Sequence, residues 1–161
     1  MNIRPTHPYP TIDLIAVTDI NDLMLWRAEV IANVFEQPAS QTLLDANRRY
    51  YLTHIADGTH YAVKALYDGE EAGCGSVCFS DELPSPDNPD GRCAYLMNIY
   101  VREPYRNNGI AHKIIDRLIA VSKRHKAAKI YLETTDQGKP VYQSSGFTAM
   151  LDMMKYYDTE T

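Results

Sequence analysis

The chain has 161 residues, a net charge of −5, and a hydrophobic fraction of 45%. This length predicts one domain over residues 1–161, and no apolar run reaches the ~18 residues of a membrane-spanning helix. The acidic balance argues against nucleic acid as the main partner, because a phosphate backbone requires a basic face. The N-terminal segment lacks the apolar core of a signal peptide, so we expect a cytoplasmic location and no membrane partner.

The N-terminal half predicts a strand, two helices and a pair of strands joined by a tight turn. Asp19 or Asn21 is expected to cap the first helix, and Gly73 and Gly75 suggest a bulge or a close backbone approach in the last strand. Residues 1–11 are expected to be an irregular lead-in. The predicted elements cover residues 12–17, 19–35, 41–56, 60–67 and 73–79.

The C-terminal half predicts a long strand, an amphipathic helix, a strand, a short helix that ends at Gly146, and one or two final strands. These elements are expected at residues 93–101, 110–119, 129–134, 138–145 and 147–157. Hairpin strands combined with strand–helix–strand crossovers predict an α/β (α+β) fold. Its central sheet should be mixed and mostly antiparallel, with helices on both faces.

The connection from the long strand to the amphipathic helix is a short polar turn at residues 104–109. Free backbone N–H groups at the start of a helix, together with the helix dipole, bind anions. Gly109 suits such a site because a residue without Cβ lets an anion approach the backbone. The turn therefore predicts a site for a phosphate or pyrophosphate.

The three cysteines, Cys74, Cys78 and Cys93, are an odd number in a chain with no cluster of metal-ligating neighbours. We therefore expect neither a disulfide framework nor a metal site. Cys74 and Cys78 are spaced to lie on one face of a strand, and all three are interpreted as buried thiols.

Two segments resemble a known family. Residues 106–111, RNNGIA, resemble the R/Q-x-x-G-x-G/A motif of the GNAT N-acetyltransferases, and residues 139–147 resemble the late family segment in which a tyrosine-bearing helix ends in Gly-Phe. The resemblance covers residues 93–157 and implies a single-domain GNAT-like fold. It also implies an acyltransferase that uses acetyl-CoA as co-substrate, without a metal. The acceptor would be a primary amine of a small molecule or of a peptide or protein, which attacks the thioester directly in a ternary complex, and the family allows a homodimer.

The resemblance assigns roles to individual residues. Tyr142 would be the catalytic acid that protonates the departing thiolate, since a phenol with a pKa of ~10 suits a thiol with a pKa of ~8.5. The end of the long strand would pair with the pantetheine arm through Ile99, Tyr100 and Val101. The pyrophosphate would be bound by Arg106 and by the amides of Asn107, Asn108, Gly109, Ile110 and Ala111.

Several alternatives stay open. Many family members carry a glutamate near the position of Asn98, so the general base here would be Glu133, a tyrosine such as Tyr95 or Tyr100, or a water molecule. The acceptor site is expected within residues 26–55, but the sequence identifies neither the acceptor nor whether the acyl group is acetyl or longer. The alternative function is a non-catalytic acyl-CoA-binding sensor or regulatory domain. A nucleotide-binding domain fits poorly, because the turn lacks a Gly-Lys-Ser/Thr ending.

Overall fold

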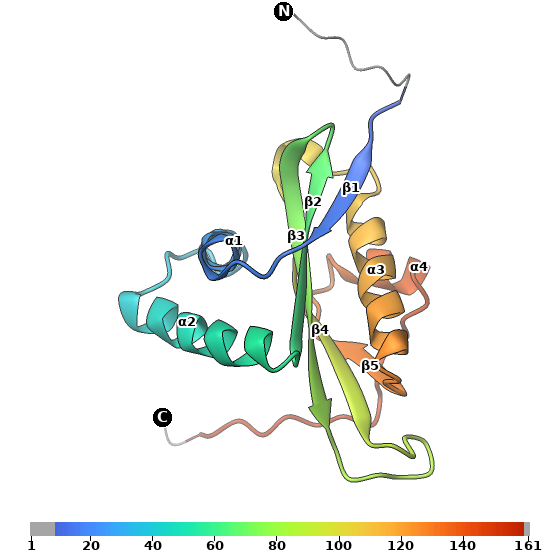
Figure 1. The fold of residues 1–161 in the computed structure, drawn as a ribbon. Coiled ribbons are helices and arrows are strands. Elements are labelled where there is room, and N and C mark those ends of the chain that lie inside the picture. Colours follow the sequence, from blue (N-terminus) through green and yellow to red (C-terminus); the bar gives the residue numbers. More distant parts are fainter. Residues whose placement is uncertain (1–8, 160–161) are drawn as a thin grey trace, which may run out of the picture.

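One five-stranded sheet organises the structure (Figure 1). The computed structural model describes residues 9–159, so the expected irregular lead-in lies largely outside the described residues. The strands follow the order of the chain: β1 (Ile12–Ala16), β2 (His60–Tyr67), β3 (Glu70–Asp81), β4 (Arg92–Val101) and β5 (Lys129–Leu132). Pairs from β1 to β4 are antiparallel, whereas β4 and β5 are parallel. The predicted mixed, mostly antiparallel sheet is confirmed.

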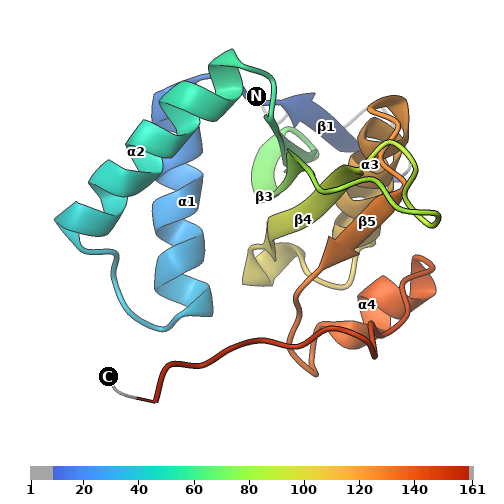
Figure 2. The same ribbon diagram turned by 90° about the horizontal axis from the view of Figure 1, so that it is seen from below.

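Helices cover both faces of this sheet, as predicted (Figures 1 and 2). One face carries α1 (Ile20–Val34) and α2 (Gln41–Ala56), and the other carries α3 (Ile110–Arg124) and the short α4 (Lys139–Ser144). The cap of α1 is Asp19, whose carboxylate accepts a hydrogen bond from the N–H of Asp22 at 2.8 Å. No helix within residues 9–159 is long and apolar enough to cross a bilayer.

The main core lies between the sheet and α3. Ile114 and Leu118 of α3 are fully buried and belong to one cluster with Val77 and Leu96 of the sheet. A Cβ on Gly75 would collide with the side chain of Ile114, so this position requires glycine to let the helix approach the strand. The close approach expected from the glycines of this strand is confirmed.

The prediction of one or two final strands in residues 147–157 is wrong. Phe147 packs against the core, but residues 148–158 form no strand and are exposed. Leu151 and Met154 are 94% and 99% exposed despite their strand-like composition. A strand requires a neighbouring backbone to pair its N–H and C=O groups, and no described strand pairs with this segment.

Two other boundaries differ from prediction. The strand expected at 73–79 is longer, because β3 runs from Glu70 to Asp81. The strand expected at 129–134 ends at Leu132, which leaves Glu133 exposed just beyond it.

Candidate active site

The pairing between β4 and the edge strand β5 ends halfway along β4. Their parallel pairing ends at Leu96 and Leu132, although β4 continues to Val101. The side of β4 that faces β5 therefore has no strand partner over residues 97–101 among the described residues 9–159. Ile99, Tyr100 and Val101, predicted to bind the pantetheine arm, lie on this open edge.

A β-bulge marks the start of the open edge. Cys74 pairs with Tyr100 and Ser76 pairs with Met97, so Asn98 and Ile99 together face Gly75. Asn98 has φ 58°, a left-handed conformation that asparagine tolerates better than most residues. A bulge of this kind bends the strand and re-aims its neighbouring groups.

The predicted anion-binding turn joins the end of β4 to α3. After the short 3₁₀ turn η1 (Glu103–Tyr105), Asn107 and Gly109 have φ of 64° and 78°. None of the hydrogen bonds formed in this turn uses the N–H groups of residues 107–112. These amides are therefore available to an anion at the N-terminus of a helix of 15 residues.

Side chains of the turn hold its shape. The Asn108 amide donates to the carbonyls of Tyr105 at 2.9 Å and Arg106 at 3.1 Å, and its carbonyl oxygen accepts from the hydroxyl of Tyr67 at 3.3 Å. The guanidinium of Arg106 donates through Nε to the carbonyl of Val101 at 2.9 Å. Arg106 thus links the strand end to the turn, and it is exposed.

Tyr142 lies on α4, which docks beside the start of α3 through a 2.6 Å contact between His112 Nε2 and Ser144 Oγ. The Tyr142 ring meets Phe147 edge-on, with the ring centroids 6.0 Å apart. Burial raises the pKa of Tyr142 above its ordinary value, which keeps the phenol protonated at neutral pH. Gly146, with φ 96°, ends this helix as predicted.

A pocket of about 400 Å³ opens between the first two helices and the sheet, at the bulge. The helices contribute lining residues within the predicted acceptor region of 26–55: Arg27, Ala46, Asn47, Tyr50 and Tyr51. Of the residues that the strands contribute, Asn98 was singled out in the sequence, whereas sequence reasoning missed His60, Cys78 and Met97. No local pattern marks them, because they are brought together only by sheet pairing and by the packing of α2.

Arg27 lines this pocket and forms hydrogen bonds with one asparagine of α2 and one of β4. Its Nε donates to Asn47 Oδ1 at 3.0 Å, and its Nη1 donates to Asn98 Oδ1 at 2.8 Å. Asn98 therefore has a contact that links α1 to the bulge.

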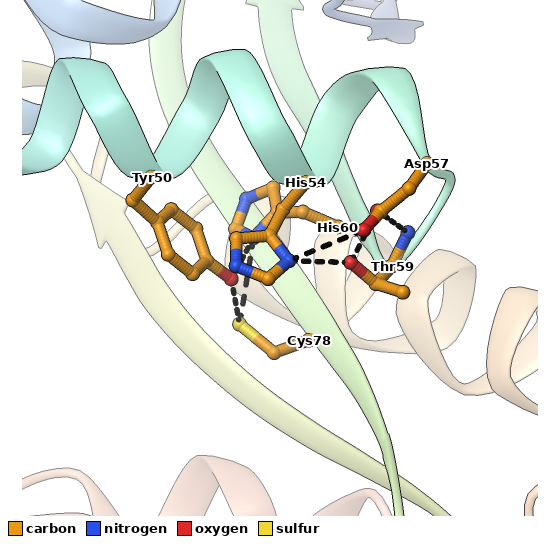
Figure 3. Close-up of polar contacts among 6 residues, drawn as sticks. All are labelled: Tyr50, His54, Asp57, Thr59, His60 and Cys78. Atoms are coloured by element: carbon orange, nitrogen blue, oxygen red, sulfur yellow. Dashed lines mark hydrogen bonds and ion pairs between the residues drawn. The ribbon is translucent and has the colours of Figure 1, made fainter.

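Three polar residues of the pocket lining, Tyr50, His60 and Cys78, contact one another (Figure 3). The Tyr50 hydroxyl lies 3.0 Å from His60 Nδ1 and 3.0 Å from Cys78 Sγ. Burial raises the pKa values of Tyr50 and Cys78, and burial followed by the nearby charges of His54 and Arg27 lowers the pKa of His60 to about 4. All three groups are consequently uncharged at neutral pH.

None of the three candidate side-chain bases lines the pocket, and Tyr95 lies directly opposite Cys78 in the pairing of β4 with β3. Burial and the adjacent Glu133 carboxylate raise the pKa of Tyr95 to about 12, and burial also raises the pKa of Tyr100. Neither phenol is a strong proton acceptor at neutral pH. Glu133 is exposed just beyond the end of β5 and stays a candidate base.

The three cysteines are free thiols, with Cys74 and Cys93 buried and Cys78 half-buried. Cys74 packs with Trp26 of α1 and Cys78 contacts Tyr50 of α2, so both lie on the same face of β3, as predicted. Within residues 9–159, no three His, Cys, Asp or Glu side chains are gathered as metal ligands.

Residues 24–147 match the model of the acetyltransferase (GNAT) family. The chain belongs to this family. The match spans the open edge of β4, the turn predicted to bind an anion and the helix that carries Tyr142. The predicted family and fold are confirmed, and this GNAT protein is an acyltransferase, which disfavours the alternative of a non-catalytic acyl-CoA sensor.

Solved structures share this GNAT fold. A predicted acetyltransferase from Clostridium acetobutylicum, solved with acetyl-CoA, is 23% identical with a TM-score of 0.81, over 91% of this chain and 96% of that chain. A GCN5-related N-acetyltransferase from Ralstonia eutropha is also 23% identical, with a TM-score of 0.75, over 91% and 99% of the two chains. Glucosamine-6-phosphate N-acetyltransferase from Arabidopsis thaliana is 18% identical with a TM-score of 0.70, over 92% and 99%. No curated protein sequence matches this GNAT chain significantly.

Proposed function

We propose that this GNAT protein is an N-acetyltransferase that moves an acetyl group from acetyl-CoA to a primary amine of a small molecule or peptide. The observation that carries the proposal is the convergence of three features at the end of β4. These are an unpaired strand edge at residues 97–101, a turn of free amides at residues 107–112, and a pocket beside Asn98. Together they suit an extended thiol arm, a pyrophosphate and an acceptor, respectively.

The coenzyme would lie along this path. Ile99, Tyr100 and Val101 would pair with the amide-containing pantetheine arm as a missing strand does. The amides from Asn107 to Ala111 would bind the pyrophosphate, with the Arg106 cation beside them. The acetyl-CoA present in the Clostridium acetobutylicum relative supports this choice of co-substrate.

The chemistry would need no covalent enzyme intermediate. The neutral amine attacks the thioester carbonyl carbon, the C–N bond forms and the C–S bond breaks, and the amine nitrogen gives its proton to a general base, for which Glu133, a tyrosine and a water molecule are the candidates. A backbone N–H freed at the bulge would stabilise the negative charge on the carbonyl oxygen. Tyr142, kept protonated by its burial, would return a proton to the thiolate.

Thermal unfolding with and without acetyl-CoA tests this proposal. A ligand at 100 times its dissociation constant stabilises the native state by about 2.7 kcal/mol, which raises the unfolding midpoint. We expect this shift with acetyl-CoA and not with ATP or NAD, followed by CoA release when an acceptor amine is added. If millimolar acetyl-CoA leaves the midpoint unchanged, the assignment of the turn and the open edge to the coenzyme is wrong.

A further inference from the structure

The charge of the acceptor pocket differs from what a polycationic amine requires. Arg27 is the sole charged group among its lining residues at neutral pH, because the remainder are neutral amides, aromatic rings, thiol, thioether and a histidine kept uncharged. No lining residue is a carboxylate. An ammonium-rich substrate such as a polyamine or aminoglycoside would therefore meet a positive charge and no compensating negative one.

Arg27 is held in place by neutral groups, unlike other cations of this face. Lys64 pairs with Asp22 at 2.9 Å and Arg102 pairs with Glu29 at 3.0 Å. Arg27 instead donates to the side-chain oxygens of Asn47 and Asn98, and it forms no ion pair with a described carboxylate. These two bonds orient the guanidinium and leave its charge and its remaining N–H donors for another acceptor.

The remaining N–H donors of Arg27 suit a planar anion. A guanidinium offers parallel N–H groups that match the two oxygens of a carboxylate. Because Nη1 already contacts Asn98, a carboxylate bound there lies beside the bulge where the open edge of β4 begins. An amine on the carbon next to that carboxylate would then lie close to the path proposed for the thioester.

The rest of the pocket suits an apolar part of a substrate. Tyr51 and Met97 line it from opposite elements, α2 and β4, and Ala46 adds a further apolar surface. Its volume of about 400 Å³ is near the lower end of the ~300–1,000 Å³ of small-molecule sites. This size suits one small molecule better than a folded protein surface.

We infer that the acceptor is an α-amino acid with an apolar or aromatic side chain, whose carboxylate is bound by Arg27 and whose α-amine is acetylated. This inference rests on the proposed function, which supplies the acetyl donor. The same arrangement favours the uncharged amine that attacks the thioester, since a neighbouring cation and a poorly hydrated wall both disfavour an ammonium ion.

The decisive experiment compares each acid with its methyl ester in a CoA-release assay. Phenylalanine, leucine and methionine are assayed against their methyl esters, alongside spermidine, kanamycin and glucosamine 6-phosphate. We expect kcat/KM to be at least about tenfold higher for a free acid than for its ester, since a hydrogen bond to a charged group is lost in the ester. Equal use of acids and esters, or a preference for one of the other three amines, would overturn the inference.

Two arginine variants separate binding from folding. Arg27→Gln should reduce the acid-to-ester ratio to about one while the unfolding midpoint still rises with acetyl-CoA. Arg49→Gln removes an exposed cation of α2 and should leave the ratio as in the wild type. A ratio that Arg27→Gln leaves unchanged would show that Arg27 does not bind the carboxylate.

If none of these amines is acetylated in the assay, a binding measurement still tests the inference. N-acetyl-L-phenylalanine and its methyl ester are each added to the protein with CoA, and the unfolding midpoint is measured. We expect a rise with the acid and a smaller one with the ester. If acetyl-CoA shifts the midpoint and the acid does not, the inference fails while the proposed function stands; if acetyl-CoA causes no shift, the proposed function itself fails.

Discussion

Tyr142 and His60 show how burial sets the charge state of individual residues near the site. Burial raises the pKa of the Tyr142 phenol and lowers that of the His60 imidazole, because both changes favour the uncharged form. For Tyr142 this state is the one that a proton donor needs. For His60 it keeps the acceptor pocket free of a second positive charge.

Replacing Tyr142 by phenylalanine should lower kcat by about 100-fold, the lower end of general acid catalysis, because the proton donor is lost. The ring contact with Phe147 is kept, so stability and acetyl-CoA binding should change little. CoA release under saturating substrate measures kcat, and thermal unfolding with acetyl-CoA measures binding. Tyr131→Phe, on β5, is the matched control and should behave as the wild type. An unchanged kcat in Tyr142→Phe would exclude the acid role.

His60 makes stability depend on pH. Its pKa is about 4 in the folded protein and ~6.5 when unfolded, so the unfolded chain binds the extra proton between these values. The stabilisation that neutral His60 contributes should be fully present above pH ~6.5. The free energy of unfolding should then fall by up to about 1.4 kcal/mol per pH unit as the pH decreases towards 4. Urea unfolding at a series of pH values checks this, with His60→Gln expected to show a shallower slope over that window. Parallel slopes would mean that His60 titrates normally.

At the scale of elements, the site arises from interruptions of regular structure. The bulge at Asn98 and the early end of β5 open the edge of β4, and left-handed residues in the turn expose the amides at the start of α3. Each interruption leaves backbone polar groups unpaired, and such groups can bind a ligand that supplies the missing partners.

A matched pair of glycine variants tests the turn. Gly109 and Gly58 have nearly equal φ, 78° and 77°, and a Cβ on either would meet no atom within 4 Å. Valine at either position should destabilise the protein by about 1–2 kcal/mol, the cost of a left-handed L-residue. Only Gly109→Val should also weaken acetyl-CoA binding, measured by titration calorimetry at a temperature where both variants are folded. Equal acetyl-CoA affinities of the two variants would argue against pyrophosphate binding at the turn.

On the scale of the whole molecule, the C-terminal segment stands apart from the packed body. Residues 148–158 are exposed and run away from α4 as an extended trace (Figures 1 and 2). They include the apolar side chains of Leu151 and Met154. The outer edge of β5 is likewise unpaired within the described sheet. Neither of these exposed features by itself shows an interface between two copies of the chain, so the homodimer stays a prediction.

Removing the residues after Thr148 should leave the free energy of unfolding within about 0.5 kcal/mol of the wild type, as for most exposed positions. The reason is that the described part of this segment, residues 149–159, is exposed and buries almost no side chain against the sheet or helices. Urea unfolding at two protein concentrations measures the difference. A loss of several kcal/mol that grows at the higher concentration would instead show that the segment packs against a second copy.

Local chemistry in the sequence was sufficient for most elements and for a prediction of where the coenzyme would bind. Hydrophobic periodicity predicted the bounds of α2 and β2 as observed, because amphipathic helices and strands are determined by neighbouring residues. The turn before α3 was predicted for the same reason, since its residues are contiguous. The final strands were predicted wrongly, because a strand exists only where another backbone is available to pair with it.

Tertiary structure alone decided the acceptor pocket. Arg27 and Asn98 are 71 positions apart, and Tyr50 and Cys78 are 28 apart, yet each pair is in contact. Contacts of this kind depend on strand register and on the positions at which α1 and α2 pack against the sheet. No short sequence pattern encodes either of these. The sequence by itself therefore determined the family and the path proposed for the coenzyme, and the folded structure decided the charge and shape that an acceptor meets, because those depend on residues brought together across the sheet.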